Sequence, residues 1–379
     1  MLPPSPIRRI AICTGGGDAP GLNAVIRAVT IAAIRRGWKC LGVRDGFNGI
    51  LFPERYPAGG VTLLTREAVR GIAHQGGTIL GTTNKGDPLH CPTRLPDGTM
   101  GEVDRSNDIL AYFEKHHIDA LVSVGGDGSL TIANALHQKG LRVVGVPKTI
   151  DNDLDKTMTT FGFDSAVAFA TECLDRLHST AQSHQRVMVV EVMGRYAGWI
   201  ALHAGIAGNA HGILIPEIPF DIDQLAQHIR ARDAYGQTYS IIVVAEGAAP
   251  RDGHAHVLQP AEAGHAERLG GIGEQVAKAL QARTGKETRV VVLGHLLRGG
   301  SPTAFDRLAA LRFGAAAVRA LDDGLSGVMV ALAFPNVNYV PLHDVAGRMK
   351  AVPLDGDTLQ TARDVGICMG DAYLSSTCP

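Results

Sequence analysis

The alternation of short apolar runs with longer amphipathic segments is the feature that most constrains the fold of this 379-residue chain. The apolar runs are rich in Val, Ile and Leu with little polar interruption, which is typical of strands buried on both faces of a parallel sheet. They lie at 8–14, 39–43, 119–124, 141–146, 186–192, 212–216, 240–246, 288–294 and 327–333. Helices are predicted between them, at 21–36, 129–139, 163–182, 197–208, 222–232, 266–284 and 302–322. The sequence therefore predicts a doubly wound α/β protein.

Two stretches interrupt this alternation. Residues 86–107 and 248–271 are rich in Gly, Pro, His and charged residues and show no periodicity, so we expect loops or excursions there. The length of the chain suits two or three domains, each with its own core.

The overall composition excludes several classes of protein. The 36 Lys and Arg residues balance 37 Asp and Glu residues, which argues against a general nucleic-acid or anionic-membrane binder while permitting local basic clusters. No apolar run approaches the roughly 18 residues of a membrane span. The six cysteines are scattered and form no CxxC motif, so we expect reduced thiols and a cytoplasmic protein.

Two glycine-rich segments follow strand-like runs and precede predicted helices. The first is TGGGDAPGLNAVIR at 14–27, and the second is GGDGS at 125–129. Glycine lets the backbone approach a ligand closely, and the N–H groups that open a helix favour phosphate. Asp127 is available to a Mg²⁺ ion. The alternative for each segment is a tight turn without a ligand, capped at the second by Asp127 or Ser129.

The polar segment VPKTIDND at 146–153 follows the run at 141–146. Asp151 at this strand end could accept a proton from an attacking hydroxyl, with Asp153 orienting it or holding metal. An Asx-type turn would favour the same Asp-Asn-Asp residues, so both interpretations stay open.

Basic residues and one carboxylate also lie at predicted strand ends or loop starts. Arginine forks bind phosphate well, although single surface arginines are usually solvated or weakly paired. Glu246 could bind sugar hydroxyls or simply cap its strand. The basic candidates are Arg186, Arg195, Arg289, His295 and Arg298.

These motifs together closely resemble the 6-phosphofructokinase family. They occur in order from residue 9 to about residue 320, and the set is far more specific than any single glycine loop. The segments that carry the resemblance are GGGDAPGLNAVIR, GGDGSL, PKTIDND, GFDSA, HQR, EVMGRYAGWIAL, VVAEGA and ETRVVVLGHLLRGGSPTAFDR.

The resemblance implies two Rossmann-like doubly wound domains with mainly parallel sheets. A domain for the phosphoryl donor would hold residues 1–160 with a return segment near 297–350. A fructose 6-phosphate domain would hold 161–296 with the C-terminal segment 351–379. The implied enzyme is a phosphotransferase of glycolysis that moves the ATP γ-phosphoryl to the 1-hydroxyl of fructose 6-phosphate.

The resemblance also implies roles for single residues. Asp151 would be the catalytic base, with Asp153 as its support, and Asp127 would hold Mg²⁺. The donor would meet Gly17, Asn84, Lys85, Gly126, Asp127, Gly128 and Ser129. The sugar phosphate would meet Thr149, Ile150, Asp151, Met193, Gly194, Arg195, Glu246, His295, Leu296, Leu297 and Arg298.

Two further features follow from the resemblance. Arg186 and Arg289 match arginines that reach a neighbour's site, which implies a homodimer or homotetramer. Asn84 and Lys85 stand where common bacterial members carry an arginine and an aromatic residue, and Lys85 would restore that charge. The regulatory pocket of those members is only partly retained, through Arg27 and Arg66.

The choice of donor depends on Gly128 and Lys148, which we count with Asp151 as catalytic positions. Members that use pyrophosphate typically carry Asp at the first position and Lys at the second. An Asp there would occupy the space of the ATP α-phosphate and repel it, whereas Gly128 leaves that space open. Lys148 adds a cation without obstructing ATP. ATP is therefore predicted, in a mixed-substrate branch; the alternatives are a pyrophosphate-dependent enzyme and a non-catalytic sugar-phosphate-binding regulator.

Overall fold

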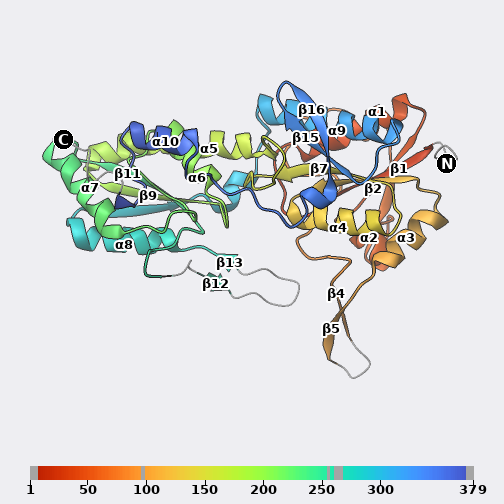
Figure 1. Ribbon diagram of the computed structural model, residues 1–379, viewed down its shortest axis with the longest axis horizontal. Coiled ribbons are helices and arrows are strands. Elements are labelled where there is room, and N and C mark those ends of the chain that lie inside the picture. Colours follow the sequence, from red (N-terminus) through yellow and green to blue (C-terminus); the bar gives the residue numbers. More distant parts are fainter. Residues whose placement is uncertain (1–6, 95–98, 254–256, 260–267, 373–379) are drawn as a thin grey trace.

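The chain forms two lobes side by side, each built on its own β-sheet (Figure 1). The computed structural model describes residues 7–94, 99–253, 257–259 and 268–372. The α/β class and the mainly parallel sheets predicted from the sequence are confirmed. All nine predicted apolar runs contain a strand.

The larger lobe contains an eight-stranded sheet in the order β16-β15-β7-β6-β1-β2-β3, with β8 paired to β7. Its inner strands are parallel, while β3 and β16 pair antiparallel at the two edges. The strands are β1 (Arg9–Thr14), β2 (Lys39–Val43), β3 (Val61–Leu64), β6 (Ala120–Gly125), β7 (Val143–Thr149), β8 (Phe161–Gly162), β15 (Val328–Ala333) and β16 (Asn336–Pro341).

Helices cover both faces of this sheet, as the apolar runs predict. Ile10 and Ile12 of β1 pack into one core with α1 (Leu22–Arg35) and α9 (Ala304–Asp322). Ala11 and Cys13 of the same strand pack into the opposite core. That second core is covered by α2 (Asn48–Leu51), α3 (Ser106–Lys115) and α4 (Asp127–Gln138). Side chains of one strand alternate between faces, so an apolar run without polar interruption requires both layers.

The smaller lobe is built on four parallel strands in the order β10-β11-β9-β14. These are β9 (Val187–Val192), β10 (Gly212–Leu214), β11 (Ser240–Ala245) and β14 (Thr288–Val292). One face packs on α5 (Phe163–His184), α6 (Trp199–Ala207) and α10 (Asp357–Asp364). The other packs on α7 (Ile222–Ala234) and α8 (Ile272–Thr284).

The chain crosses between the lobes more than once. It leaves the larger lobe through α5 and returns through η2 (Gly294–Arg298) and α9. After β16 and η3 (Leu342–Asp344) it crosses back, and Val352 and Leu359 pack in the core of the smaller lobe. Among the described residues, no helix combines the length and apolar character needed to span a membrane.

The two segments predicted to be loops or excursions, 86–107 and 248–271, each contain a pair of short strands. Antiparallel hairpins occur there, formed by β4 (Cys91–Arg94) with β5 (Met100–Val103) and by β12 (Val257–Gln259) with β13 (Arg268–Leu269). The first hairpin projects from the larger lobe (Figure 1). Each hairpin is a sheet of only two short strands. Such strands need not alternate apolar and polar residues, so the sequence gives no strand signal there. The sequence pattern also does not predict the helices α2, α3 and α10 or the short helices η1 (Pro53–Arg55), η2 and η3.

Candidate active site

A cavity of about 1000 Å³ lies between the two lobes. This volume is at the upper end of the range for small-molecule sites. The larger lobe contributes Gly15, Asn84 and Gly128, and the smaller lobe contributes Met193 and Glu246. Residues at the ends of strands from both sheets thus line one cavity. Doubly wound folds bind their ligands at the carboxyl ends of the strands.

The first glycine segment lies against the second in this cavity. The Gly15 N–H donates to the Val124 carbonyl at 2.9 Å. A Cβ added at Gly15 would lie 2.6 Å from Ser129 Oγ, and one at Gly17 would lie 2.2 Å from Arg298 Nη1. A side chain at Gly15 or Gly17 would have to move Ser129 or Arg298, so glycine allows both to approach this segment closely.

The second glycine segment opens α4 at Asp127, directly after the strand β6. Gly128 and Ser129 line the cavity, in the first turn of that helix. The backbone N–H groups of a first helical turn have no partner within the helix and favour anions. A Cβ added at Gly128 would meet nothing within 4 Å, so the space beyond Gly128 is open.

Asp127 is half-buried beside this turn. Its Oδ1 accepts a hydrogen bond from the Gly347 N–H at 2.7 Å. Asp127 is not among the residues that line the cavity. Its negative charge helps to raise the pKa of the Asp153 carboxyl, which burial raises most.

Asp151 lines the cavity two residues after the end of β7. Its Oδ1 is buried and has no hydrogen-bond partner among the described residues. Burial, and secondarily the charge of Asp153, raises the pKa of the Asp151 carboxyl to about 6. The cations of Arg298, Lys148 and Arg195 oppose that rise. A carboxylate with a pKa near neutrality and an open lone pair is suited to take a proton.

Lys148 is the second-last residue of β7, three positions before Asp151, and is only 3% exposed. Its ammonium donates to the Gly17 carbonyl. Burial, with repulsion from Arg298, lowers the pKa of Lys148 to about 8. Lys148 lies behind the first glycine segment and is not among the lining residues.

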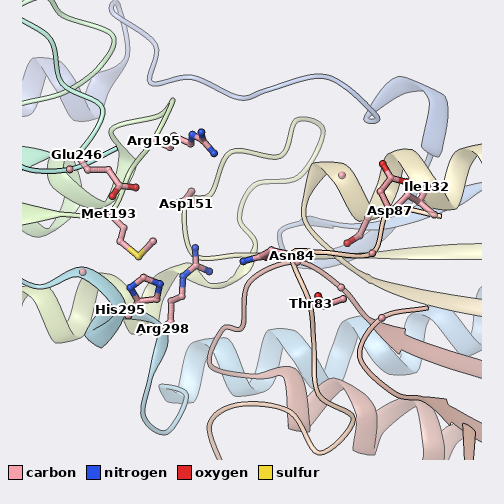
Figure 2. Close-up of a pocket in the computed structure, with 18 of the residues that line it drawn as sticks. Thr83, Asn84, Asp87, Ile132, Asp151, Met193, Arg195, Glu246, His295 and Arg298 are labelled. Atoms are coloured by element: carbon pink, nitrogen blue, oxygen red, sulfur yellow. The ribbon is translucent and has the colours of Figure 1, made fainter. Parts of the chain in front are cut away.

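The smaller lobe brings a group of polar side chains to the opposite wall. Figure 2 shows Arg195 and Arg298 on either side of Asp151, with His295 and Met193 next to Arg298. Arg298 Nη1 donates to the Asp18 carbonyl at 3.1 Å, which ties this arginine to the larger lobe.

Glu246 at the end of β11 lines the same wall. Burial raises the pKa of its carboxyl to about 7, with the charges of Asp151 and Glu191 adding to the rise. A carboxyl group with this pKa can accept or donate a hydrogen bond near neutral pH, which suits contact with hydroxyl groups.

Several predicted site residues do not line the cavity. Ile150 and Leu297 are buried in the core of the smaller lobe. Arg186 Nε and Arg289 Nη2 both pair with Glu287, at 2.7 Å and 2.5 Å, away from the cavity. The others absent from its lining are Gly17, Lys85, Gly126, Asp127, Lys148, Thr149, Gly194 and Leu296.

The structure adds lining residues that the sequence did not indicate. Asp87, shown in Figure 2, and Gly270 fall within the two segments predicted to be loops. Glu191 lies inside the strand β9, and its carboxylate accepts hydrogen bonds from the N–H groups of Gly271 and Gly273 where α8 begins. An acidic residue inside the run RVMVVEV was the available signal for Glu191.

Comparisons with known proteins agree with this architecture. The family model described as phosphofructokinase matches residues 9–321. A protein of Chloroflexus aggregans named ATP-dependent 6-phosphofructokinase is 51% identical over 364 residues, covering 96% of this chain and 98% of that protein. A protein of Amycolatopsis mediterranei named pyrophosphate–fructose 6-phosphate 1-phosphotransferase is 47% identical over 351 residues, covering 92% and 97%.

A solved structure supports the same assignment. Phosphofructokinase from Saccharomyces cerevisiae superimposes with a TM-score of 0.74 at 32% identity, covering 89% of this chain and 45% of that chain. The resemblance found in the sequence is thereby confirmed, and this chain belongs to the phosphofructokinase family.

Proposed function

We propose that this protein transfers the γ-phosphoryl group of ATP to the 1-hydroxyl of fructose 6-phosphate, a phosphotransferase reaction of glycolysis. The observation that carries the proposal is the position of Asp151. Its carboxylate lies at the cavity between the two lobes, with a pKa near neutrality and with cationic side chains nearby. The names of relatives about half identical to this chain support the same reaction.

The two lobes divide the substrates in this proposal. The larger lobe, residues 1–160 with a return near 297–350, binds the donor. The smaller lobe, 161–296 with 351–379, binds the sugar phosphate. The open first turn of α4 at Gly128 supports a phosphate site on the donor side. His295, Arg195 and Arg298 supply hydrogen bonds and positive charge on the sugar side.

The reaction is a direct displacement in this scheme. Asp151 takes the proton of the sugar hydroxyl as its oxygen attacks phosphorus, and the bond to the leaving ADP oxygen breaks. Arg298, tied to Asp18, neutralises charge that develops on the transferring group. Lys148, buried behind the first glycine segment, adds positive charge from the donor side. No covalent enzyme intermediate is required.

The residues present fit a Mg²⁺ ion that arrives with the donor. The described residues contain no group of three or more His, Cys, Asp or Glu side chains that could hold a metal. Magnesium usually keeps several waters and binds through one or two carboxylates together with substrate phosphates. Asp127, the first residue of α4, is the carboxylate that would hold it. When bound, the ion would neutralise phosphate charge.

Pyrophosphate is the second candidate donor. Lys148 matches the pyrophosphate-using members, and one relative of this chain is named for that reaction. The open space beyond Gly128 supports ATP, because neither bulk nor charge stands in the way of an α-phosphate.

Assays of the purified protein with each donor test the choice. We expect turnover of fructose 6-phosphate with Mg²⁺ and ATP. Turnover with pyrophosphate alone would reverse the donor assignment, and turnover with neither would remove the proposed function.

We also propose that the active form is a homodimer or homotetramer in the cytoplasm. Arg186 and Arg289 pair with Glu287 and do not line the cavity of their own chain, which supports their use at a neighbour's site. The five cysteines of the described residues are free thiols, in keeping with a reducing compartment.

A further inference from the structure

A short connecting segment, residues 345–352, crosses from the larger lobe to the smaller one after η3. We call it the crossing segment. Val345 at its start is buried in the core of the larger lobe, and Val352 at its end is buried in the core of the smaller lobe. Figure 1 shows it, in blue, passing between the lobes before α10.

Backbone N–H groups of the crossing segment donate hydrogen bonds to two aspartates of the proposed site, Asp127 and Asp153. The Gly347 N–H donates to Asp127 Oδ1 at 2.7 Å. The Lys350 N–H donates to the Asp153 carbonyl at 2.8 Å, beside a bridge between Met349 and Leu154. The crossing segment therefore runs along the back of the loop that carries Asp151.

The same segment is tied to the smaller lobe. The Trp199 indole N–H donates to the Lys350 carbonyl at 2.8 Å. The Val352 N–H donates to Glu217 Oε1 at 2.8 Å, and Glu217 also accepts the Gly198 N–H. Because both lobes hold it, the position of Lys350 is fixed on two sides.

The Lys350 ammonium is fully engaged. It donates to Asn152 Oδ1 at 3.0 Å, to the Thr157 carbonyl at 3.1 Å and to the Met158 carbonyl at 3.3 Å. An ammonium has three hydrogen atoms to donate, so these acceptors match its capacity. The ammonium also lies 5.5 Å from the centroid of the Trp199 ring, within the range of a cation–π contact.

The most informative of these acceptors is Asn152, which stands between Asp151 and Asp153. Its backbone has φ of 52°, the left-handed conformation that non-glycine residues rarely adopt, and its side chain is only 4% exposed. Asn152 Oδ1 also accepts the Thr160 N–H at 3.2 Å. Lys350 and Thr160 therefore hold one side chain at the point where the loop turns.

We propose that Lys350 is a positioning residue for phosphoryl transfer, which fixes the loop 150–158 through Asn152 and so places the Asp151 carboxylate. The inference rests on the proposed function for its kinetic consequence. Its structural part, the ordering of the loop, is independent of any activity. A displacement of about 1 Å in a reacting group can reduce a rate about 100-fold.

Hydrogen exchange tests the structural part directly. In Lys350→Met, which keeps most of the aliphatic stem, we expect the Thr160 amide and its neighbours in 150–160 to exchange at least about 10-fold faster than in the native protein. Lys115→Met, at the exposed end of α3, should leave these rates unchanged. Unchanged exchange in Lys350→Met would overturn the inference.

Kinetics with ATP and fructose 6-phosphate test the consequence. We expect Lys350→Met to lower kcat about 10- to 100-fold, while the equilibrium dissociation constant for fructose 6-phosphate changes less than about twofold. Lys350→Arg should recover part of kcat. In an Asp151→Asn background, Lys350→Met should have little further effect, because Lys350 acts through Asp151. Equal losses in both backgrounds would contradict the positioning role.

A second variant covers the case in which Lys350→Met fails to fold. Asn152→Gly accepts the positive φ without strain but removes the amide oxygen that Lys350 and Thr160 share. It should produce the same fall in kcat and the same faster exchange at Thr160. Native turnover and exchange in Asn152→Gly would overturn the inference. If the native protein lacks turnover with every donor, the proposed function fails while the exchange result still stands.

Discussion

Asp151 differs from an ordinary surface carboxylate in two ways that chemistry can use. Its Oδ1 has no hydrogen-bond partner among the described residues, and burial raises its pKa to about 6. Native proteins rarely leave a buried polar atom unsatisfied. An open oxygen at a cavity wall is therefore consistent with a bond that forms only when a substrate is present.

Asp151→Asn should reduce turnover at least about 1000-fold, because an amide cannot take the hydroxyl proton. Binding of fructose 6-phosphate, measured by calorimetry, should change little. Asp175→Asn on the exposed side of α5 is the matched control. Native turnover in Asp151→Asn would contradict the catalytic role, and absence of turnover in the native protein would favour the binding regulator.

The pH dependence follows from the same carboxylate. Asp151 must be deprotonated to act as a base, so kcat/KM should fall as the pH drops below about 6. The charge of Asp153 raises the pKa of Asp151. Asp153→Asn should therefore lower that pKa and move the acid limb to lower pH. A pH profile of kcat/KM checks this, and a shift to higher pH would show that the sign is wrong.

Gly128 is the residue on which the donor choice depends. Gly128→Asp places a carboxylate in the open space beyond the first turn of α4, and like charges brought together cost several kcal/mol. We expect kcat/KM for ATP to fall at least about 100-fold. Gly128→Ala, which adds bulk without charge, should reduce it less. Unchanged ATP kinetics in Gly128→Asp would contradict the donor argument.

Two helices of different lobes, α5 and α9, are hydrogen-bonded at their first turns. Asp306 of α9 is fully buried, and its Oδ2 accepts the N–H and the hydroxyl of Ser165 in α5, both at 2.7 Å. The Thr303 N–H in turn donates to Ser165 Oγ at 3.0 Å. Thr303 follows η2 by five residues, so this contact also anchors the chain that carries His295 and Arg298.

Ser165→Ala should destabilise the protein by about 1–3 kcal/mol, because it leaves the half-buried Thr303 N–H and the buried Asp306 carboxylate each short of one partner. Unfolding in urea measures the loss. Ser179→Ala makes the same change of residue type on the exposed face of the same helix. It should lower the free energy of unfolding far less than Ser165→Ala. Equal losses in the two variants would show that the joint between α5 and α9 adds no stability.

For the whole molecule, the proposal of shared sites has a distinctive consequence. If Arg289 completes a neighbour's site, a dimer of one Asp151→Asn chain and one Arg289→Ala chain has one site with both defects and one with neither. Random re-association of the two inactive variants should therefore restore about one quarter of native turnover. No recovery in mixed, co-refolded samples would indicate that each chain carries a complete site.

The layers of both lobes could be predicted from local sequence patterns. The apolar runs located nine strands, because burial on both faces leaves little polar interruption in a strand. The apolar runs do not include the antiparallel strands β3 and β16, which lie at the two edges of the sheet and are largely exposed or half-buried. They also do not include the strands of the two short hairpins. Local motifs also identified Gly128, Asp151 and Arg298, since strand ends of a doubly wound sheet gather at one edge.

The distant segments that support those residues could not be predicted, because the folded path of the chain brings them together. Gly347 lies 220 positions from Asp127 and Lys350 lies 198 positions from Asn152, yet each pair is hydrogen-bonded. Neither Gly347 nor Lys350 stands in a periodic run or a glycine motif. Their contacts depend on how the chain crosses between the lobes, and local periodicity carries no record of that path. The pKa of Asp151 depends on the same assembly, because it is set by burial and by charges from several segments.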